Sequence, residues 1–137
     1  MEKIKSDAKS DGYTQTFFGR RRYFEGLRSK IPFIKAMAER MAINAPIQGT
    51  LSDFIKLAMV KTDEFLRKEK IEERVKLILQ VHDELVYEAE EDVAKTVAPQ
   101  IRNIMENIIA VEKTKGIIMK ADISIGDNWR DMEEVKI

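Results

Sequence analysis

Three neighbouring polar residues are the first candidates for chemistry: His82, Asp83 and Glu84. They separate two apolar, β-branched runs, 75–81 and 85–87, which predicts a β-hairpin with the triplet at its tip. Adjacent carboxylates repel each other, and a cation relieves that repulsion. Ligands that are only oxygens favour Mg²⁺ or Mn²⁺ over zinc, and carboxylates that share Mg²⁺ with substrate phosphates are typical of phosphoryl transfer. The triplet is therefore either a metal-binding turn or an ordinary exposed turn.

The composition narrows the chemistry further. The chain has 137 residues with no cysteine and one histidine, which excludes disulfides, thiolate nucleophiles and metal sites built from several histidines. No apolar run approaches the ~18 residues of a membrane span, and no signal-peptide pattern opens the chain. We therefore expect one cytoplasmic domain, or part of a larger one, whose catalysis rests mostly on carboxylates.

Charge is segregated along the chain although its total is zero. Residues 1–41 carry ten Lys and Arg against five Asp and Glu, whereas residues 81–112 carry two against eight. A basic first third suits a polyanion and an acidic later region suits a cation, although both patterns also describe solvated surfaces.

The elements that must position the triplet follow from periodicity and helix breakers. We expect an α+β fold in the order α-α-β-β-α-β, with a helix pair packed on a small antiparallel sheet. Pro32 begins the first long helix, and Pro46 and Gly49 predict an interruption between residues 44 and 50. The other expected elements are a short strand or ordered loop at 13–18, a second helix from 51, the hairpin at 75–87, a third helix at 90–110 with a kink or break at Pro99, and a last strand at 117–125.

These residues resemble a known family in four collinear places. The run from Gln80 to Val86 resembles the third catalytic motif of family A DNA polymerases, the bacterial DNA polymerase I group. The basic run Phe18-Gly19-Arg20-Arg21-Arg22-Tyr23, with Gly12 to Thr16 before it, is similar to the segment that closes that family's fingers. Two further stretches are similar to its palm helices and its closing Gly-x-x-Trp: Ala38 to Met59, and Gly126 to Trp129.

The resemblance implies a fold and a catalytic role. Residues 1–30 would be the basic late-fingers segment, and residues 31–137 the C-terminal palm portion. Asp83 would be a ligand of the catalytic Mg²⁺ ions, Glu84 would assist it as a second metal-binding acid, and His82 would lie close to the primer end. The implied activity is template-directed nucleotidyl transfer by two metal ions in DNA replication or repair, near the nucleoid.

The resemblance also implies partners, namely primer–template DNA and deoxynucleoside triphosphates. Asn44 and Gln48 would contact the minor groove, where every base pair presents acceptors, so that amide donors test pair geometry without reading sequence. Arg40 and the cluster of Arg20, Arg21 and Arg22 (the arginine cluster) would hold phosphates, which position DNA without specifying it.

The sequence differs from the family in one important way, which bears on the implied activity. A family A active site needs a second Asp from an earlier palm strand and a fingers helix that grips the nucleotide, and neither lies in these residues. We therefore expect the chain to be inactive without an N-terminal polymerase segment, supplied in cis or in trans. Two alternatives are a non-catalytic DNA-binding module and a Mg²⁺-dependent nuclease or phosphatase on an unrelated α+β fold. The Asp83–Glu84 pair argues against the first alternative, and the collinear motifs argue against the second.

Overall fold

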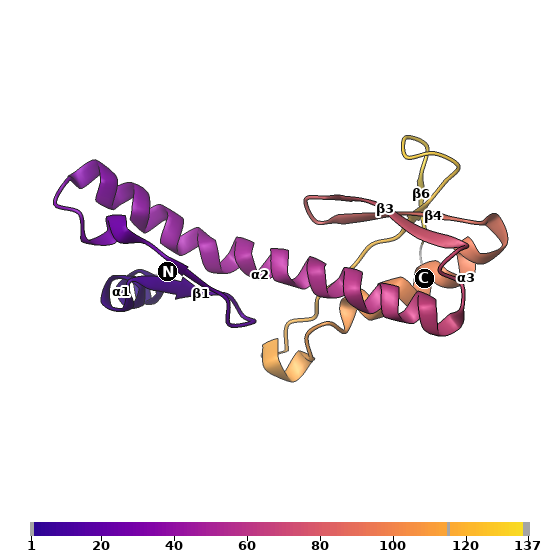
Figure 1. The fold of residues 1–137 in the computed structure, drawn as a ribbon, viewed down its shortest axis with the longest axis horizontal. Coiled ribbons are helices and arrows are strands. Elements are labelled where there is room, and N and C mark those ends of the chain that lie inside the picture. Colours follow the sequence, from indigo (N-terminus) through magenta and orange to yellow (C-terminus); the bar gives the residue numbers. More distant parts are fainter. Residues whose placement is uncertain (1, 115, 136–137) are drawn as a thin grey trace. The chain divides into compact units, whose positions relative to one another are not determined.

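The computed structural model describes residues 2–114 and 116–135, coloured along the chain in Figure 1. The chain divides into two compact units, Met1–Ile55 and Lys56–Ile137. The boundary falls inside the longest helix, α2 (Pro32–Glu69), so each unit contains part of that helix. This division differs from the expected boundary at residue 30. It concerns compactness alone, and the assignment of residues 1–30 to fingers and 31–137 to palm stays a prediction.

The first unit is built around a short hairpin. Helix α1 (Glu2–Asp11) leads into strands β1 (Tyr13–Gln15) and β2 (Arg21–Tyr23), which pair antiparallel, and a 3₁₀ turn (Glu25–Arg28) leads to α2. Gly12 ends α1 with a φ of +79°, a conformation that glycine adopts without steric cost. The buried core of this unit uses small residues on α2, and its members are Ala8, Phe24, Leu27, Ala38, Ala42 and Ala45.

Helix α2 is continuous, so the interruption predicted between residues 44 and 50 is wrong. Pro46 has no N–H and removes one bond from the helical ladder, which is why the sequence predicted a break. The hydroxyl of Thr50 donates to the carbonyl oxygen of Pro46 at 2.6 Å, and the loop after β1 packs on the same turns. The first of these contacts is local, within one turn of α2, whereas the second comes from Phe17, 33 residues earlier in the chain. The expected helix pair is therefore one helix.

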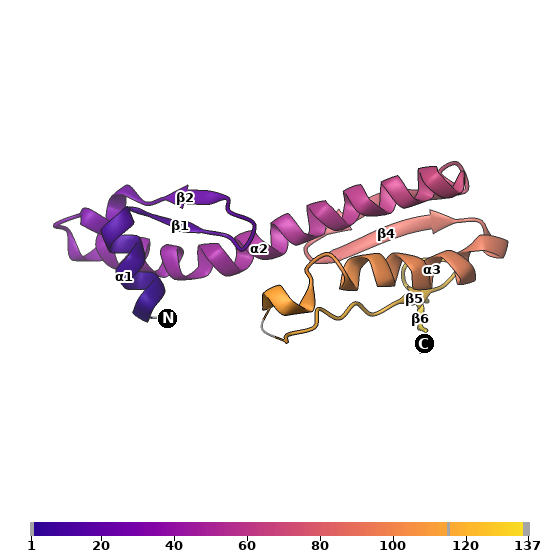
Figure 2. The same cartoon turned by 90° about the horizontal axis from the view of Figure 1, so that it is seen from below.

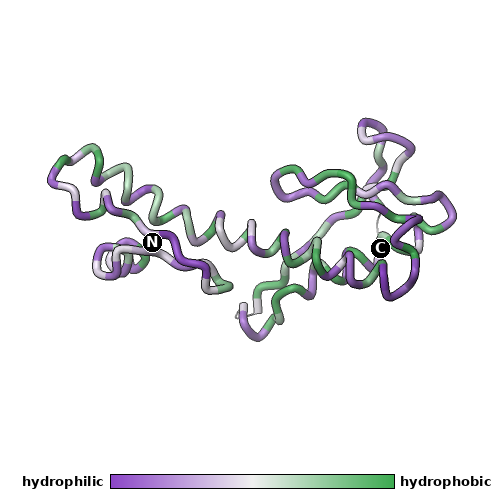
Figure 3. Tube along the Cα trace, viewed as in Figure 1, coloured by the Kyte–Doolittle hydropathy of each residue, from purple (hydrophilic) through white to green (hydrophobic). Residues whose placement is uncertain are grey.

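The second unit contains the predicted hairpin. Strands β3 (Val75–Val81) and β4 (Glu84–Ala89) pair antiparallel, with Val81 opposite Glu84, which confirms the hairpin prediction. The hairpin packs against the end of α2 and against α3 (Glu91–Glu106), and Leu66, Val75, Val97 and Ile101 form the buried core there (Figure 2). In Figure 3 the apolar stretches of this hairpin are green and its polar tip is purple.

Two predictions for the C-terminal third need correction. Helix α3 ends at Glu106 rather than at residue 110, and it continues through Pro99 without the break that was one of the two expectations. The predicted strand at 117–125 is reduced to β5 (Ser124–Ile125), which pairs with β6 (Glu133–Glu134). A strand needs a hydrogen-bonded neighbour, and β6 offers only two residues to pair. A second 3₁₀ turn (Val111–Thr114) follows α3.

The α+β class and the antiparallel pairing are confirmed, although the described strands form three two-stranded sheets rather than one. No helix in the described part of the chain is long and apolar enough to cross a lipid bilayer.

Candidate functional site

The tip of the β3–β4 hairpin carries the predicted triplet. His82 and Asp83 form the two-residue turn, and Glu84 is the first residue of β4. The turn contains no glycine, and His82 takes the left-handed conformation with a φ of 52°, which histidine tolerates better than most residues do. The side-chain amide of Gln80 donates to the carbonyl oxygen of His82 at 2.7 Å and closes the turn from inside the hairpin. The turn is thus specified by side chains rather than by glycine.

The two carboxylates at this tip face solvent. Asp83 and Glu84 are both exposed, and among the residues that the structure describes neither carboxylate receives a hydrogen bond or an ion pair. In the same residues, no three His, Asp or Glu side chains gather closely enough to hold a metal ion. Carboxylate oxygens suit Mg²⁺, but Mg²⁺ demands near-octahedral coordination and takes its remaining ligands from water and substrate phosphates. The donor types therefore fit Mg²⁺, and Asp83 with Glu84 can supply part of its coordination.

A second group of predicted residues lies along α2. Arg40, Asn44 and Gln48 follow one another at intervals of four residues, so the continuous helix places them on one side, and all three are exposed. In residues 2–114 and 116–135, their side chains make no hydrogen bond or ion pair with the rest of the chain. The uninterrupted α2 thus presents one cationic and two amide side chains as a row of available donors.

The arginine cluster does not act as one group. Arg20 turns towards α2, where its Nε donates to Asp53 Oδ1 at 2.8 Å. The guanidinium of Arg21 lies over the ring of Tyr13, 4.6 Å from the centroid, whereas that of Arg22 lies over Phe24 at 5.4 Å. Successive strand residues point to opposite faces, which explains why Arg21 and Arg22 find different aromatic partners.

One hollow in the first unit brings three of the predicted residues together. It has a volume of about 180 Å³, and Arg20, Arg22 and Gln48 line it. Thr14, Thr16, Ala45 and Gly49 complete the wall. Two guanidinium groups and an amide around one hollow favour an anionic ligand. Arg21, Arg40 and Asn44 are not among its lining residues.

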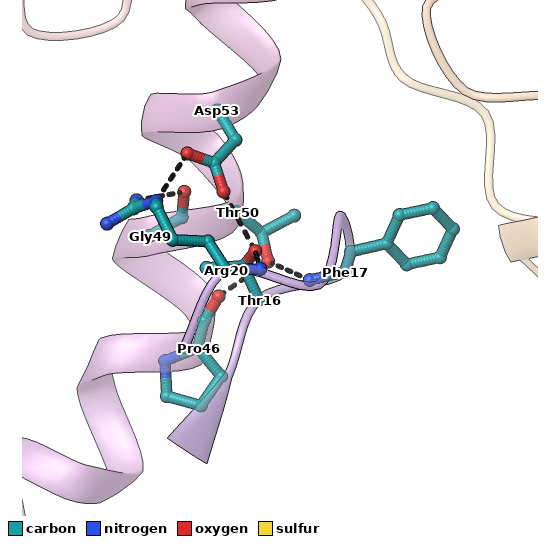
Figure 4. A network of polar contacts seen from close by, with 7 residues as sticks. All are labelled: Thr16, Phe17, Arg20, Pro46, Gly49, Thr50 and Asp53. Carbon is teal, nitrogen blue, oxygen red and sulfur yellow. Dashed lines mark hydrogen bonds and ion pairs between the residues drawn. The ribbon is translucent and has the colours of Figure 1, made fainter. Parts of the chain in front are cut away.

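A polar network that the sequence did not reveal supports this hollow (Figure 4). Thr16 Oγ1 donates to Asp53 Oδ2 at 2.8 Å, and the backbone N–H of Phe17 donates to Thr50 Oγ1 at 2.9 Å. Arg20 Nη2 donates to the carbonyl oxygen of Gly49 at 3.2 Å, and Arg20 N donates to Thr16 Oγ1 at the same distance. Thr16, Gly49, Thr50 and Asp53 all belong to stretches that resemble the family. Their local pattern held no sign of the contacts between the loop and α2, because those partners lie 29 to 37 residues apart.

One ion-pair cluster fixes the N-terminal helix of the first unit. Lys5 Nζ and Lys9 Nζ lie 2.6 Å and 2.8 Å from the two carboxylate oxygens of Glu39. The hydrogen bonds from Lys5 and Lys9 lower the pKa of Glu39 from its usual range to about 2. Glu39 directly precedes Arg40, so this cluster ties α1 to α2 beside the row of donors.

Comparison with a solved structure defines the class of protein. The chain is similar to the POL domain of Pol1 from M. smegmatis, solved in complex with DNA primer–template and dNTP. The two share 38% sequence identity with a TM-score of 0.76, and the match covers 80% of this chain and 19% of that one. The fold is therefore that of part of a polymerase domain.

Sequence comparison then gives the family. The profile of DNA polymerase family A matches residues 1–131, and the chain belongs to this family. It is 39% identical over 129 residues to DNA polymerase I of Rhizobium leguminosarum, which covers 94% of this chain and 13% of that protein. It is also 39% identical over 134 residues to the thermostable DNA polymerase I of Thermus aquaticus, with 98% and 15% covered. The chain thus spans about one seventh of the length of these relatives.

Proposed function

We propose that this chain is the C-terminal part of a DNA-directed DNA polymerase, in which it supplies palm carboxylates and a surface that holds primer–template DNA. One observation carries the proposal: in a member of family A, the adjacent carboxylates of Asp83 and Glu84 stand exposed on a tight turn between two paired strands. The turn presents acids that have no partner among the described residues, and a divalent cation with a nucleotide's phosphates is the natural complement of such a pair.

The metal would be held by Asp83, with Glu84 as the helper and further ligands from outside this chain. The chemistry that divalent ions would supply at such a site is polarisation of the attacking 3′-hydroxyl and neutralisation of charge on the pyrophosphate leaving group. The paired strands on either side of the turn define where the backbone of Asp83 lies. His82, the other residue of the turn, would lie close to the primer end. The second catalytic Asp and the nucleotide-gripping helix come, in this proposal, from an N-terminal polymerase segment.

The first unit would hold the DNA. Arg40 and the arginine cluster neutralise phosphates, and Asn44 and Gln48 donate to minor-groove acceptors. The row of Arg40, Asn44 and Gln48 supports this assignment, since it offers donors at helical spacing without internal partners in the described part of the chain. We propose replication or repair of DNA at the nucleoid as the setting of this function, in keeping with the likeness to bacterial DNA polymerase I.

A chimaera tests the proposal. The part of the Thermus aquaticus relative that matches this chain, about 15% of its length, is replaced by the 134 matching residues of this chain. Family membership alone makes correct assembly the expected result, and primer extension with four deoxynucleoside triphosphates and Mg²⁺ should then proceed on a defined template. A chimaera that folds and binds duplex DNA without incorporating nucleotides would favour the alternative of a non-catalytic DNA-binding module.

A further inference from the structure

We propose that Asp53 is a positioning residue: through Arg20 and Thr16 it holds the turn between β1 and β2 against α2, and it thereby places Arg22 beside Gln48 to contact a DNA phosphate. This inference rests on the proposed DNA-holding function and assigns different roles within the arginine cluster. Arg20 then has a structural role within the chain, and Arg22 is the cation that contacts the phosphate.

The geometry at Asp53 supports a structural clamp. Its side chain is only 13% exposed, and its two oxygens are engaged separately, Oδ1 by Arg20 and Oδ2 by Thr16. Both partners lie in one tight loop, in which Thr16 N donates to Arg20 O at 2.9 Å and Gly19 N donates to Thr16 O at 3.0 Å. A single carboxylate on α2 therefore fixes both ends of the loop that joins β1 to β2 (Figure 4).

Gly49 allows the loop between β1 and β2 to pack closely against α2. A Cβ at this position would stand 2.7 Å from Thr16 Cγ2, closer than two carbon atoms can approach, so any other residue pushes the loop away. The carbonyl oxygen of Gly49 accepts from Arg20 Nη2 at 3.2 Å. A glycine in mid-helix ordinarily weakens a helix, and here it allows a close approach of the backbone to the loop.

The contacts that hold the loop also determine where Arg22 lies. Strand β2 begins directly after the clamped loop, and Arg22 lines the same hollow as Gln48. Arg20 also borders this hollow, but its Nε and Nη2 already donate to Asp53 and Gly49. Arg22 has no carboxylate partner among the described residues, and its guanidinium lies over an aromatic ring that leaves its N–H groups available. Release of the clamp would separate Arg22 from Gln48 without removing either residue.

Neutralisation of Asp53 distinguishes a positioning role from a purely electrostatic one, because the two roles predict opposite changes in affinity for DNA. If Asp53 were only a negative charge near a DNA-binding surface, Asp53→Asn would strengthen binding to a polyanion. If Asp53 positions the loop, the same change weakens binding, since the amide cannot serve both partners as an anion does.

The experiment measures binding of the 137-residue chain to a fluorescently labelled primer–template duplex over a series of salt concentrations. We expect Asp53→Asn to weaken binding about tenfold, as for the loss of one charge-assisted contact. The slope of log K against log salt should become shallower by about 0.9, as for one lost phosphate contact. Arg22→Ala should give the same change in slope. The matched control is Asp63→Asn, which neutralises an exposed acid on the same helix and should bind equally well or slightly more tightly.

A second pair of variants keeps the test independent of any folding defect in Asp53→Asn. Gly49→Ala leaves every charge and donor in place, yet its new methyl group clashes with Thr16 Cγ2, so it should weaken binding to a similar degree. Thr16→Ser removes that Cγ2 and keeps the hydroxyl that bonds Asp53. The double variant should therefore recover most of the affinity that Gly49→Ala loses.

The outcomes separate the inference from the function on which it rests. Binding by Asp53→Asn that equals or exceeds that of the unchanged chain would overturn the positioning role, as would a Gly49→Ala defect that Thr16→Ser fails to relieve. Binding of the unchanged chain that is absent or insensitive to salt would contradict the proposed DNA surface itself, and the inference with it.

Discussion

The two regions that carry the candidate residues are stabilised by different kinds of contact. In the first unit, the loop between β1 and β2 is fixed to α2 by Asp53, Thr50 and Gly49 through a network of polar contacts. In the second unit, the hairpin packs on an apolar core, and the acids at its tip make no hydrogen bond or ion pair with the described residues. A surface that must hold an extended polyanion benefits from being rigid in advance, because less entropy is then lost on binding. A pair of acids that must receive a cation is instead left open to it.

The largest effect should come from the open acids. In the chimaeric polymerase, we expect Asp83→Ala to reduce kcat by about 10³-fold or more, since a metal ligand contributes several kcal/mol to the transition state. Glu84→Ala should cost less, about tenfold, because a helper acts through the ion that Asp83 holds. Steady-state primer extension measures both losses.

Glu88→Ala is the matched control for these two variants. It removes an exposed acid from the same hairpin, on β4 and away from the turn, and should leave kcat close to that of the parent. A loss at Glu88 as large as that at Asp83 would mean that the hairpin's overall charge matters rather than one ligand.

The apolar core of the second unit should give the next largest effect, on stability rather than on chemistry. Leu66 is 4% exposed and packs with Val75, so Leu66→Ala should lower the free energy of unfolding by about 2–5 kcal/mol. Leu57→Ala makes the same change on the same helix at a residue that is 36% exposed, and it should cost about 0.5 kcal/mol or less. Urea denaturation of the chain compares the two. Equal costs would show that the second unit does not rest on this core.

The row on α2 should show a smaller effect that is confined to DNA. Gln48 is exposed, and Gln48→Ala removes the donor that we propose for the minor groove, so kcat/KM for primer extension by the chimaera should fall about three- to tenfold. The thermal midpoint should stay within about 2 °C of the parent, as expected for a surface change. Ser52→Ala, another exposed residue of α2, is the control. A lower midpoint with unchanged extension would contradict the assignment.

The smallest expected effect is on how the stability of the first unit depends on pH. The pKa of Glu39 is lowered in the folded chain to about 2, below its ordinary value of 4.5. Its ion pairs therefore contribute stability above about pH 4.5, and this contribution is lost as the pH falls from 4.5 towards 2. Glu39→Gln should lower the thermal midpoint slightly at pH 7, and the difference from the parent should shrink at pH 3. A difference that is the same at both pH values would exclude this linkage.

Sequence reasoning worked best where the determining contacts are local. The alternation of the 75–87 region and its short connector specify the β3–β4 hairpin, and the triplet at its tip could be located from that pattern alone. The left-handed conformation of His82 was not predictable in this way, because no glycine marks it.

The same reasoning failed where distant residues decide. Local rules predict a break at Pro46 and Gly49, but α2 is continuous across them, and the loop around Thr16 packs on these turns from more than thirty residues away. No local pattern marks Asp53 as the partner of Arg20 and Thr16, which lie 33 and 37 residues away. The strand expected at 117–125 is shorter in the structure because a distant partner is missing rather than present: β6 offers only two residues for pairing.

The central claim is that the acids at the hairpin tip are part of a polymerase active site that another segment must complete. Primer extension with the purified 137-residue chain, alone and together with the N-terminal polymerase segment of a family A relative, tests it most directly. We expect no incorporation by the chain alone at any Mg²⁺ or Mn²⁺ concentration, and incorporation that depends on Asp83 once the segment is added. Robust incorporation by the chain alone would contradict the account, because the chain would then contain a complete active site.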